Sequence, residues 1–358
     1  MQFDEALIGE LYTLYIPYAA TAYTLYFNGV EQVRMGEISK TEKGFSPQQQ
    51  VKLHQFTVLA TEIVVALQVA NFSNMVGGAE RAILVGPSDS MIKYYQSEKK
   101  REHFILGCFL FMVINMFSLY YFRRQETSYL WVGLIGLFLI LWYVFSKDHL
   151  IMDIFPNLSW EWMTKLELLI VFLAFAFYNK YISVAYKNYY NQQIPFYSFV
   201  SLGILLVLCI FLPVSSIVIL FNIASVLIIF FALHVAYMSY RLLRDKQPYA
   251  RAIVLTNLAF FIPFIQDMFY IQGFINTNYY SIYGFMFFSF GSLVMLNFEH
   301  TKKYRESETY NLALTAINQG LEETVEERTR ELREKNHQLE LLTVRDGLTN
   351  IANRRYFD

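Results

Sequence analysis

The sequence predicts an α-helical membrane protein: a seven-helix bundle with a β-sandwich before it and a coiled-coil helix after it. Of the 358 residues, 55% are hydrophobic and only 16% are charged, and the charged residues gather toward the two ends of the chain. Between residues 104 and 298 lie several long runs without Asp, Glu, Lys or Arg. After residue 298 the composition changes abruptly to Glu, Arg, Leu and Gln.

A helix needs about 20 apolar residues to cross a bilayer. In hydrocarbon only helices or closed barrels satisfy the backbone, and continuous apolar runs of this length indicate helices. We expect a membrane domain over residues 103–299 with seven spans, namely Phe104–Phe122, Thr127–Ser146, Leu166–Ile182, two spans within Asn188–Tyr240 that turn at Pro213, Ala252–Gln272 and Tyr279–Phe298.

Basic residues predict the orientation of these spans, because Lys and Arg are enriched in cytoplasmic connections. With the N-terminus outside, the inner connections and tail hold Arg123, Arg124, Lys180, Lys187, Arg241, Arg244, Lys246, Arg251, Lys302, Lys303 and Arg305. Lys99, Lys100 and Arg101 lie on the outer side of the first span and oppose this charge bias. A folded domain before them would still be translocated despite such charges. We therefore expect an extracytoplasmic N-terminal domain and a cytoplasmic C-terminus.

Residues 1–100 are expected to form the outer β domain. Strand-forming residues fill the segments Leu11–Ile16, Ala22–Phe27, Glu62–Ala70 and Ala82–Val85. Asn28 and Gly29 predict a tight hairpin turn, because both positions tolerate positive φ. The polar run Ser39–Gln50 is expected to be a loop. Both cysteines lie in predicted spans, so the outer domain has to be stable without a disulfide.

The pattern that begins LYIPYAA at Leu14 and ends ILVG at Gly86 resembles the galactose-binding-like jelly roll that precedes some bacterial seven-span receptors, and the resemblance covers roughly residues 8–86. The resemblance lacks that domain's opening strands, and residues 1–10 carry no signal peptide, so we expect the domain to be incomplete at its N-terminus. The resemblance implies a carbohydrate or other small-molecule ligand. Alternatively, Asn71, Phe72, Ser73 and Asn74 simply make a turn, since turn residues are common.

Polar residues within spans are candidates for function, because they are costly in the membrane. Glu167 and Asp267 lie at similar depth near the outer surface, and Asn257 is a further polar position. We predict that these three residues help to line a ligand pocket that faces outward. The alternative is that the two carboxylates are hydrated at the interface, with Lys165 as the partner of one of them.

Two other classes of seven-span protein are less consistent with the sequence. A retinal protein needs a lysine in its last span, and Tyr279–Phe298 contains none. A transporter is expected to show broken helices in repeated halves. Pro213 and Pro263 interrupt two spans, but the sequence shows no internal symmetry.

Residues 300–345 predict a cytoplasmic coiled coil that joins two copies of the chain. Apolar residues recur at heptad spacing, and the seam consists of Leu314, Leu321, Val325, Leu332, Leu339 and Leu342. Asn318, Arg328 and Lys335 interrupt this seam. Polar seam residues lower the stability of the dimer and leave other packings close in energy, so the coil is suited to switching. The alternative is a single charged helix in solvent.

Residues 346–358 resemble the opening of the GGDEF diguanylate cyclase domain. The motif runs Asp346-Gly-Leu-Thr-Asn-Ile-Ala-Asn-Arg-Arg-Tyr-Phe357, and its matching positions include Asp346, Leu348, Thr349, Asn353, Arg354 and Arg355. Asn350 and Ile351 replace the usual glycine and leucine. The order of a β domain, seven spans and a coil also resembles the bacterial seven-transmembrane receptors with diverse intracellular signalling modules.

These resemblances imply a receptor of the bacterial inner membrane that controls cyclic di-GMP synthesis from two GTP molecules. The opening motif is structural in that family, and the residues that bind GTP and Mg²⁺ lie downstream of it. We therefore expect residues 346–358 to be a truncated GGDEF domain, with no catalytic residue, metal site or cofactor in this chain. The alternative is an output domain that only binds nucleotide or dimerises. A nucleic-acid partner is not expected.

Overall fold

The computed structural model describes residues 1–16, 19–48, 50–73, 77–79, 82–146, 150–155, 158–213, 216–272, 274–275, 277, 279–344 and 351–352. By their contacts the residues form two compact units, Met1–Leu296 and Asn297–Asp358. The first unit contains an N-terminal β region and the helical bundle. The second contains most of the long C-terminal helix.

The β region consists of two three-stranded antiparallel sheets and a small two-stranded pair. One sheet has the order β5-β1-β8, formed by Lys52–Thr57, Leu11–Ile16 and Leu84–Pro87. The other has the order β4-β3-β6, formed by Val30–Met35, Ala22–Phe27 and Val65–Ala70. The pair joins β2, Ala19–Ala20, with β7, Gly78–Ala79. The strands alternate their side chains, so the apolar residues pack into a core around Leu14, Tyr23, Leu25, Phe27 and Phe56.

The predicted hairpin is confirmed, because Asn28 and Gly29 join β3 to β4 with φ values of 48° and 84°. Two strands differ from the prediction in their bounds, since Glu62 makes only an isolated bridge and β8 begins at Leu84. Strand β5 was not predicted from the sequence. Its sequence, KLHQFT, has few strand formers, and pairing with β1 along its whole length holds it in the sheet.

His54 of β5 lies against the aromatic rings of Phe27 and Phe56, with ring centroids 5.6 and 6.4 Å away. Burial lowers the pKa of His54. A histidine whose pKa is lowered by folding stabilises the fold above its unfolded pKa of about 6.5, and this contribution is lost as the pH falls below that value.

We therefore expect the β region to be less stable at pH 5.5 than at pH 7.5. We expect this difference in stability to be smaller in His54→Phe than in the wild type. Protease susceptibility of the β region, measured against temperature at both pH values, checks this. The matched control is His337→Phe on the exposed part of the C-terminal helix. Equal pH dependence in the wild type and His54→Phe would remove His54 as the cause.

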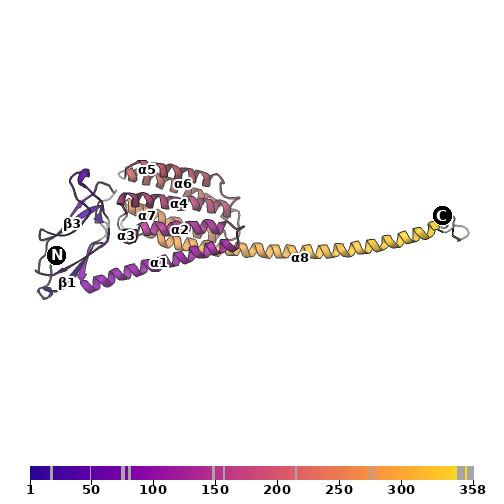
Figure 1. Cartoon of the computed structure of the whole chain (residues 1–358), viewed down its shortest axis with the longest axis horizontal. Coiled ribbons are helices and arrows are strands. Elements are labelled where there is room, and N and C mark those ends of the chain that lie inside the picture. Colours follow the sequence, from indigo (N-terminus) through magenta and orange to yellow (C-terminus); the bar gives the residue numbers. More distant parts are fainter. Residues whose placement is uncertain are drawn as a thin grey trace. The chain divides into compact units, whose positions relative to one another are not determined.

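Seven long apolar helices follow within the described residues, which confirms the prediction of seven spans. The helices are α1 Ser88–Phe122, α2 Ser128–Ser146, the short α3 Leu150–Ile154, α4 Trp160–Ala185, α5 Ile194–Phe211, α6 Ile217–Arg244, α7 Ala250–Ile271 and α8 Ser281–Val344. Short connections make successive spans antiparallel (Figure 1). We call the end where α4 begins the Trp160 end and the end where it finishes the Tyr186 end.

Helix α1 begins at Ser88, well before the predicted span start at Phe104, so residues 88–100 belong to a helix and not to the sheets. The Ser88 side chain is hydrogen-bonded to Thr13 of β1 at 2.7 Å and to Gln55 of β5 at 2.8 Å. The Tyr15 ring contacts the rings of Tyr94 and Tyr95. The first span is thus continuous with a helix that is packed on the sheet, without a flexible linker between them.

Close packing at glycines joins α1 to α2. A Cβ atom at Gly136 would lie 2.7 Å from Val113 of α1, and one at Gly133 would lie 3.1 Å from Phe117. Small residues allow such close approach of helix backbones in membranes. On its other face α2 packs on α4, where Trp131 and Phe138 contact the ring of Phe177.

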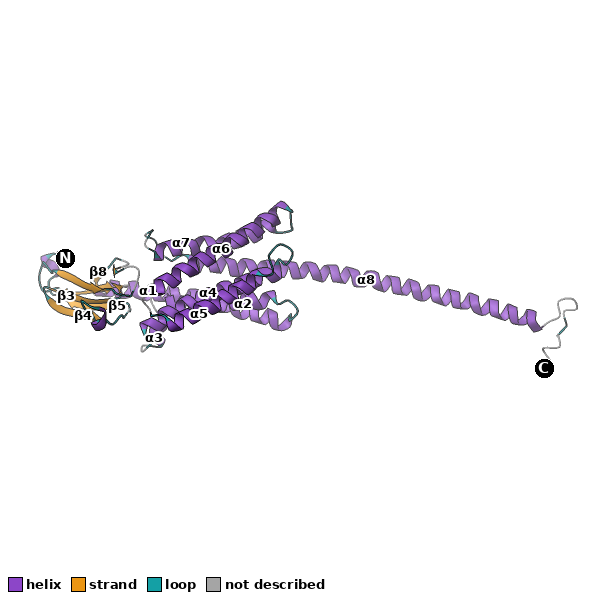
Figure 2. Ribbon diagram, turned by 90° about the horizontal axis from the view of Figure 1, so that it is seen from above, coloured by secondary structure: helices purple, strands orange, loops and turns teal. Residues whose placement is uncertain are grey.

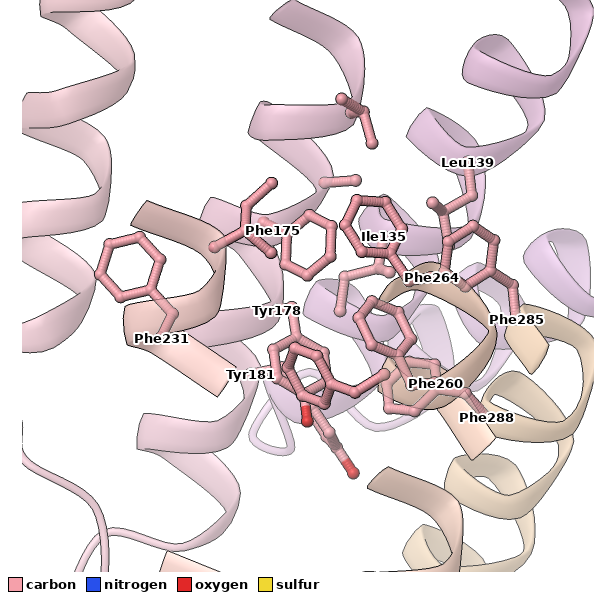
Figure 3. Close-up of a cluster of buried hydrophobic side chains, with 14 of the residues drawn as sticks. Ile135, Leu139, Phe175, Tyr178, Tyr181, Phe231, Phe260, Phe264, Phe285 and Phe288 are labelled. Carbon is pink, nitrogen blue, oxygen red and sulfur yellow. The ribbon is translucent and has the colours of Figure 1, made fainter. Parts of the chain in front are cut away.

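An aromatic cluster forms the centre of the bundle. Figure 3 shows Phe175 and Tyr178 of α4 next to Phe260 and Phe264 of α7, with Phe285 and Phe288 of α8 beside them. Tyr178 and Phe260 stack with ring centroids 4.6 Å apart, and Phe260 lies 4.8 Å from Phe288. The cluster connects α4 to the last two spans.

Candidate functional site

Asp267 lies near the C-terminal end of α7 and is only 2% exposed. Its carboxylate accepts hydrogen bonds from the backbone N–H groups of Tyr280 at 2.8 Å and Ser281 at 2.9 Å. Ser281 is the first residue of α8 and Tyr280 precedes it, and the N–H groups at the start of a helix have no partner within the helix. A carboxylate at this place also interacts favourably with the positive end of the helix dipole. Asp267 therefore fastens the start of α8 to α7.

Asn257 lies on the same helix, about 15 Å along the axis from Asp267 at a rise of 1.5 Å per residue. It is buried, accepts a hydrogen bond from Tyr178 of α4 at 2.9 Å and donates one to Ser239 of α6 at 3.4 Å. Asn257 thus joins three spans nearer to the Tyr186 end.

Glu167 is partly buried in α4, and its carboxylate is hydrogen-bonded to the side chains of Ser146 and Trp142 of α2. Lys165 is paired with Glu161 at 2.6 Å, so neither Glu167 nor Asp267 has the partner considered for it from the sequence. Among the described residues no hydrogen bond joins any two of Glu167, Asp267 and Asn257. Each belongs to a separate contact between helices, and a shared ligand pocket stays a prediction.

The structure adds a contact between α7 and α8 that was not predicted from the sequence. A Cβ atom at Gly284 of α8 would overlap the carbonyl oxygen of Ala259 and lie 2.8 Å from Pro263 Cγ. Proline has no N–H, so the Ala259 carbonyl lacks its usual helical donor at residue 263. The Ala259 carbonyl faces Gly284 of α8, an arrangement that suits a weak Cα–H···O hydrogen bond from the glycine.

A second glycine continues this contact seven residues further along α8. A Cβ atom at Gly291 would lie 2.6 Å from Thr256 Oγ1. Together with the bonds of Asp267, the two glycines fix α8 to α7 at three levels; we call Asp267, Ala259, Pro263, Thr256, Gly284 and Gly291 the α7–α8 clamp. Two glycines seven apart on one helix face were the signal available in the sequence.

The connection between α4 and α5 is fixed to the bundle by polar contacts at the Tyr186 end. Tyr190 donates a hydrogen bond to Asn179 of α4 at 2.6 Å, and burial raises the pKa of Tyr190. Arg241 of α6 lies over the ring of Tyr189, 5.3 Å from its centroid. This end of α4, α5 and α6 is therefore a joined unit.

We expect Tyr178→Phe to weaken the bundle, because it removes the donor to buried Asn257 while it keeps the ring in the aromatic cluster. Hydrogen bonds between membrane helices are worth about 0.6 kcal/mol on average and up to about 1.7 kcal/mol. Unfolding of the full chain in mixed micelles measures the change. Tyr283→Phe, at an exposed ring on α8, is the matched control. A Tyr178→Phe variant as stable as the control would mean that the hydrogen bond contributes nothing.

The polar residues after β6 form a turn in the β region. The Asn71 side chain accepts hydrogen bonds from Thr21 at 3.3 Å and from the backbone of Ser73 at 3.1 Å. Asn74 lies outside the described residues. The geometry agrees with the simpler of the two interpretations considered for this segment, since an Asx turn accounts for Asn71.

The family described as 7TM diverse intracellular signalling matches residues 102–299, which is more than half of the chain. This chain belongs to that family. The match includes residues of all seven apolar helices, and it supports a multi-pass membrane receptor with an intracellular signalling role. No curated protein and no solved structure matches the chain.

In this 7TM diverse intracellular signalling protein, the last span and the charged segment after it form one helix, α8 (Figure 2). The seam residues Leu314, Leu321, Val325, Leu332 and Leu339 are between 56% and 61% exposed. The side chain of Leu342 lies outside the described residues. The predicted dimer seam therefore has an apolar stripe open to a partner, while dimerisation itself stays a prediction.

Apart from residues 351–352, the GGDEF-like opening motif lies outside the part of the chain that the structure describes. This concerns Asp346, Leu348, Thr349, Asn353, Arg354 and Arg355. Their proposed structural role at the start of an output domain stays an interpretation of the sequence.

Proposed function

We propose that this chain is the sensing and transmitting part of a receptor that couples an extracytoplasmic ligand to cyclic di-GMP synthesis. The β region receives a small molecule or carbohydrate. The bundle, in the bacterial inner membrane, passes the change to α8. Two copies pair through residues 300–345, and the two GGDEF domains that follow join two GTP molecules with the help of Mg²⁺.

The observation that carries the proposal is the continuity of α8 from the α7–α8 clamp to the seam residues. Because the clamp and the seam lie on one helix, we expect a rotation or shift of α8 at the clamp to be passed along the helix to the seam. The polar seam positions Asn318, Arg328 and Lys335 keep alternative packings close in energy. A small displacement at the membrane is then enough to change the pairing of two output domains.

The input side has an equally direct connection. Ser88 ties the start of α1 to β1 and β5, and Gly133 and Gly136 of α2 pack closely on α1. From α2 the contacts continue through α4 and its bond from Tyr178 to Asn257 of α7. A ligand that favours one arrangement of the β region can shift the population of α8 positions by its differential affinity.

The proposed orientation follows from charge. The connections at the Tyr186 end carry Arg123, Arg124, Lys187 and Lys246, and Arg251 lies in the first turn of α7 at the same end. Cytoplasmic connections carry an excess of Lys and Arg. We therefore assign the Tyr186 end to the cytoplasm and the β region to the opposite side of the membrane.

A phase test on α8 examines the coupling in the native gene product with its downstream sequence. Two residues inserted after Gly320 rotate the following helix by about 200°, whereas seven residues rotate it by only about 20°. Cyclic di-GMP formation from GTP and Mg²⁺ in proteoliposomes is the readout. We expect the two-residue insertion to change the rate at least fivefold and the seven-residue insertion to leave it near the wild-type rate.

Equal rates for both insertions would contradict transmission through a defined helix phase. GTP binding without turnover in the wild type would favour the alternative, a receptor whose output domain only binds nucleotide. Binding of members of a glycan panel to the full chain addresses the ligand class, and no binding to any member would exclude a carbohydrate from that panel.

A further inference from the structure

The side chain of Asn222 faces outward from the apolar surface of the bundle. Asn222 of α6 is exposed, and it lies in a shallow depression of about 380 Å³ lined by Ile219, Asn222, Ile223, Val226 and Leu227. Ile219 and Val226, one heptad apart on either side of Asn222, are 62% and 67% exposed. The outward stripe continues at helical spacing through Phe230, Leu233 and Tyr237.

Helix lengths place Asn222 within the hydrocarbon. Helix α5 has only 18 residues, about 27 Å at 1.5 Å per residue. A hydrocarbon core is about 30 Å thick, so the turn between α5 and α6 lies close to its edge. Asn222 follows Ser216, the residue before α6, by six positions, which puts it about 9 Å further along the axis. Within the described part of the chain its amide makes no hydrogen bond.

An amide in this position is unfavourable when only lipid surrounds it, because hydrocarbon offers neither donors nor acceptors. Polar side chains in spans usually face the bundle interior or a partner helix. Contact with lipid explains why the residues around Asn222 are apolar. It does not explain why an amide lies among them.

We propose that this face of α6, centred on Asn222, packs against the same face of a second copy of the chain. An amide carries both donors and an acceptor, so two Asn222 side chains can satisfy each other. A two-fold interface brings the same residue of both copies to the axis, which makes this pairing possible without any other polar residue. A lipid headgroup is a less complete partner, because it lies at the membrane surface and not at the depth of Asn222.

The α6 contact rests on the proposed function in one respect, because both require two copies of the chain to associate. It differs from the seam of α8 because it lies inside the membrane. It would hold the two bundles at a fixed distance, so that a change in each bundle reaches α8 as a relative motion of two neighbouring helices. The α6 contact and the α8 seam can be tested separately.

Disulfide cross-linking of the full chain in membranes tests the contact. Cys108 and Cys209 are first replaced by Ala, and single cysteines are then introduced as Asn222→Cys, as Leu332→Cys on the α8 seam, and as Phe111→Cys on α1. Phe111 is the matched control, since it is 70% exposed on another helix. Because a disulfide needs Cβ atoms about 3.5–4.5 Å apart, we expect Asn222→Cys to cross-link at least fivefold more than Phe111→Cys.

The combinations separate the two proposals. Cross-linking at Leu332→Cys but not at Asn222→Cys would overturn the α6 contact and leave the coiled coil. Cross-linking at Asn222→Cys alone would support the α6 contact and contradict the seam. No cross-linking at either position would overturn both, and adducts of Asn222→Cys with another protein would replace the second copy by a different partner.

A second measurement does not depend on a cysteine at the contact. Energy transfer between labelled full chains in bilayers gives the dimer dissociation constant. We expect Asn222→Leu to weaken association about three- to tenfold, as expected for one interhelical hydrogen bond, and Asn222→Gln to retain most of it. The side chain points outward, so each bundle should fold as before. Association that is unchanged or tighter in Asn222→Leu would overturn the inference.

Discussion

Gly284→Ala is expected to destabilise the bundle by about 1–3 kcal/mol, the usual effect of overpacking a tight contact. The added methyl group would overlap the Ala259 carbonyl oxygen, which is a backbone atom and cannot rotate away. It would also lie 2.8 Å from Pro263 Cγ, on a ring with little freedom. The two helices would have to separate, and Gly284→Val should have a larger effect than Gly284→Ala.

The same substitution elsewhere is the control. A methyl group added at Gly203 of α5 or at Gly107 of α1 would meet no atom of another helix within 4 Å. Replacing glycine by alanine inside a helix generally stabilises it by about 0.5–1 kcal/mol. Unfolding of the full chain in mixed micelles should therefore shift in opposite directions for Gly284→Ala and Gly203→Ala. Shifts of the same sign and size would mean that α7 and α8 are not in close contact.

Asp267→Ala is expected to cost about 2–3 kcal/mol, because it leaves two N–H groups at the start of α8 without an acceptor in an apolar setting. Asp267→Asn keeps one acceptor oxygen but loses the charge, so we expect about half of that loss. The same unfolding measurement gives both values. Amide hydrogen exchange should also become faster in the first turn of α8, from Ser281 to Gly284, before it changes elsewhere.

Asp245→Ala is the matched control for this prediction. Asp245 pairs with Arg244 at 2.9 Å on the surface, and surface ion pairs contribute about 0–1 kcal/mol. If Asp267→Ala were no more destabilising than Asp245→Ala, the carboxylate would not be holding the start of α8. A pocket role for Asp267 would then become the stronger interpretation.

The spans were predictable because each is a long apolar run. The hairpin was predictable because Asn28 and Gly29 tolerate the positive φ that such a turn requires. The early start of α1 was not predictable in the same way. Residues 88–101 are charged and aromatic, and what keeps them helical is their packing on β1 through Ser88 and Tyr15. Likewise β5 depends on its pairing with β1, which a polar sequence does not reveal.

The candidate site was predictable in its residues but not in its geometry. Asp267 and Asn257 were recognised as polar positions in a span, yet the partner of each comes from another helix. A single sequence does not show that the first N–H groups of α8 meet Asp267, or that Gly284 faces a carbonyl freed by Pro263. Those relations arise from packing between spans, which composition and periodicity do not specify.

In the proposed function a stimulus crosses the membrane between the β region and the seam of α8. Labelling of single cysteines in intact cells, with Cys108 and Cys209 replaced, tests this most directly. Leu59→Cys reports on the β region, where residue 59 is 81% exposed, and Leu332→Cys reports on α8. A membrane-impermeant maleimide should label Leu59→Cys in cells whose inner membrane is intact, and Leu332→Cys only after that membrane is opened. Equal labelling of both cysteines before opening would place them on the same side and contradict the proposed function.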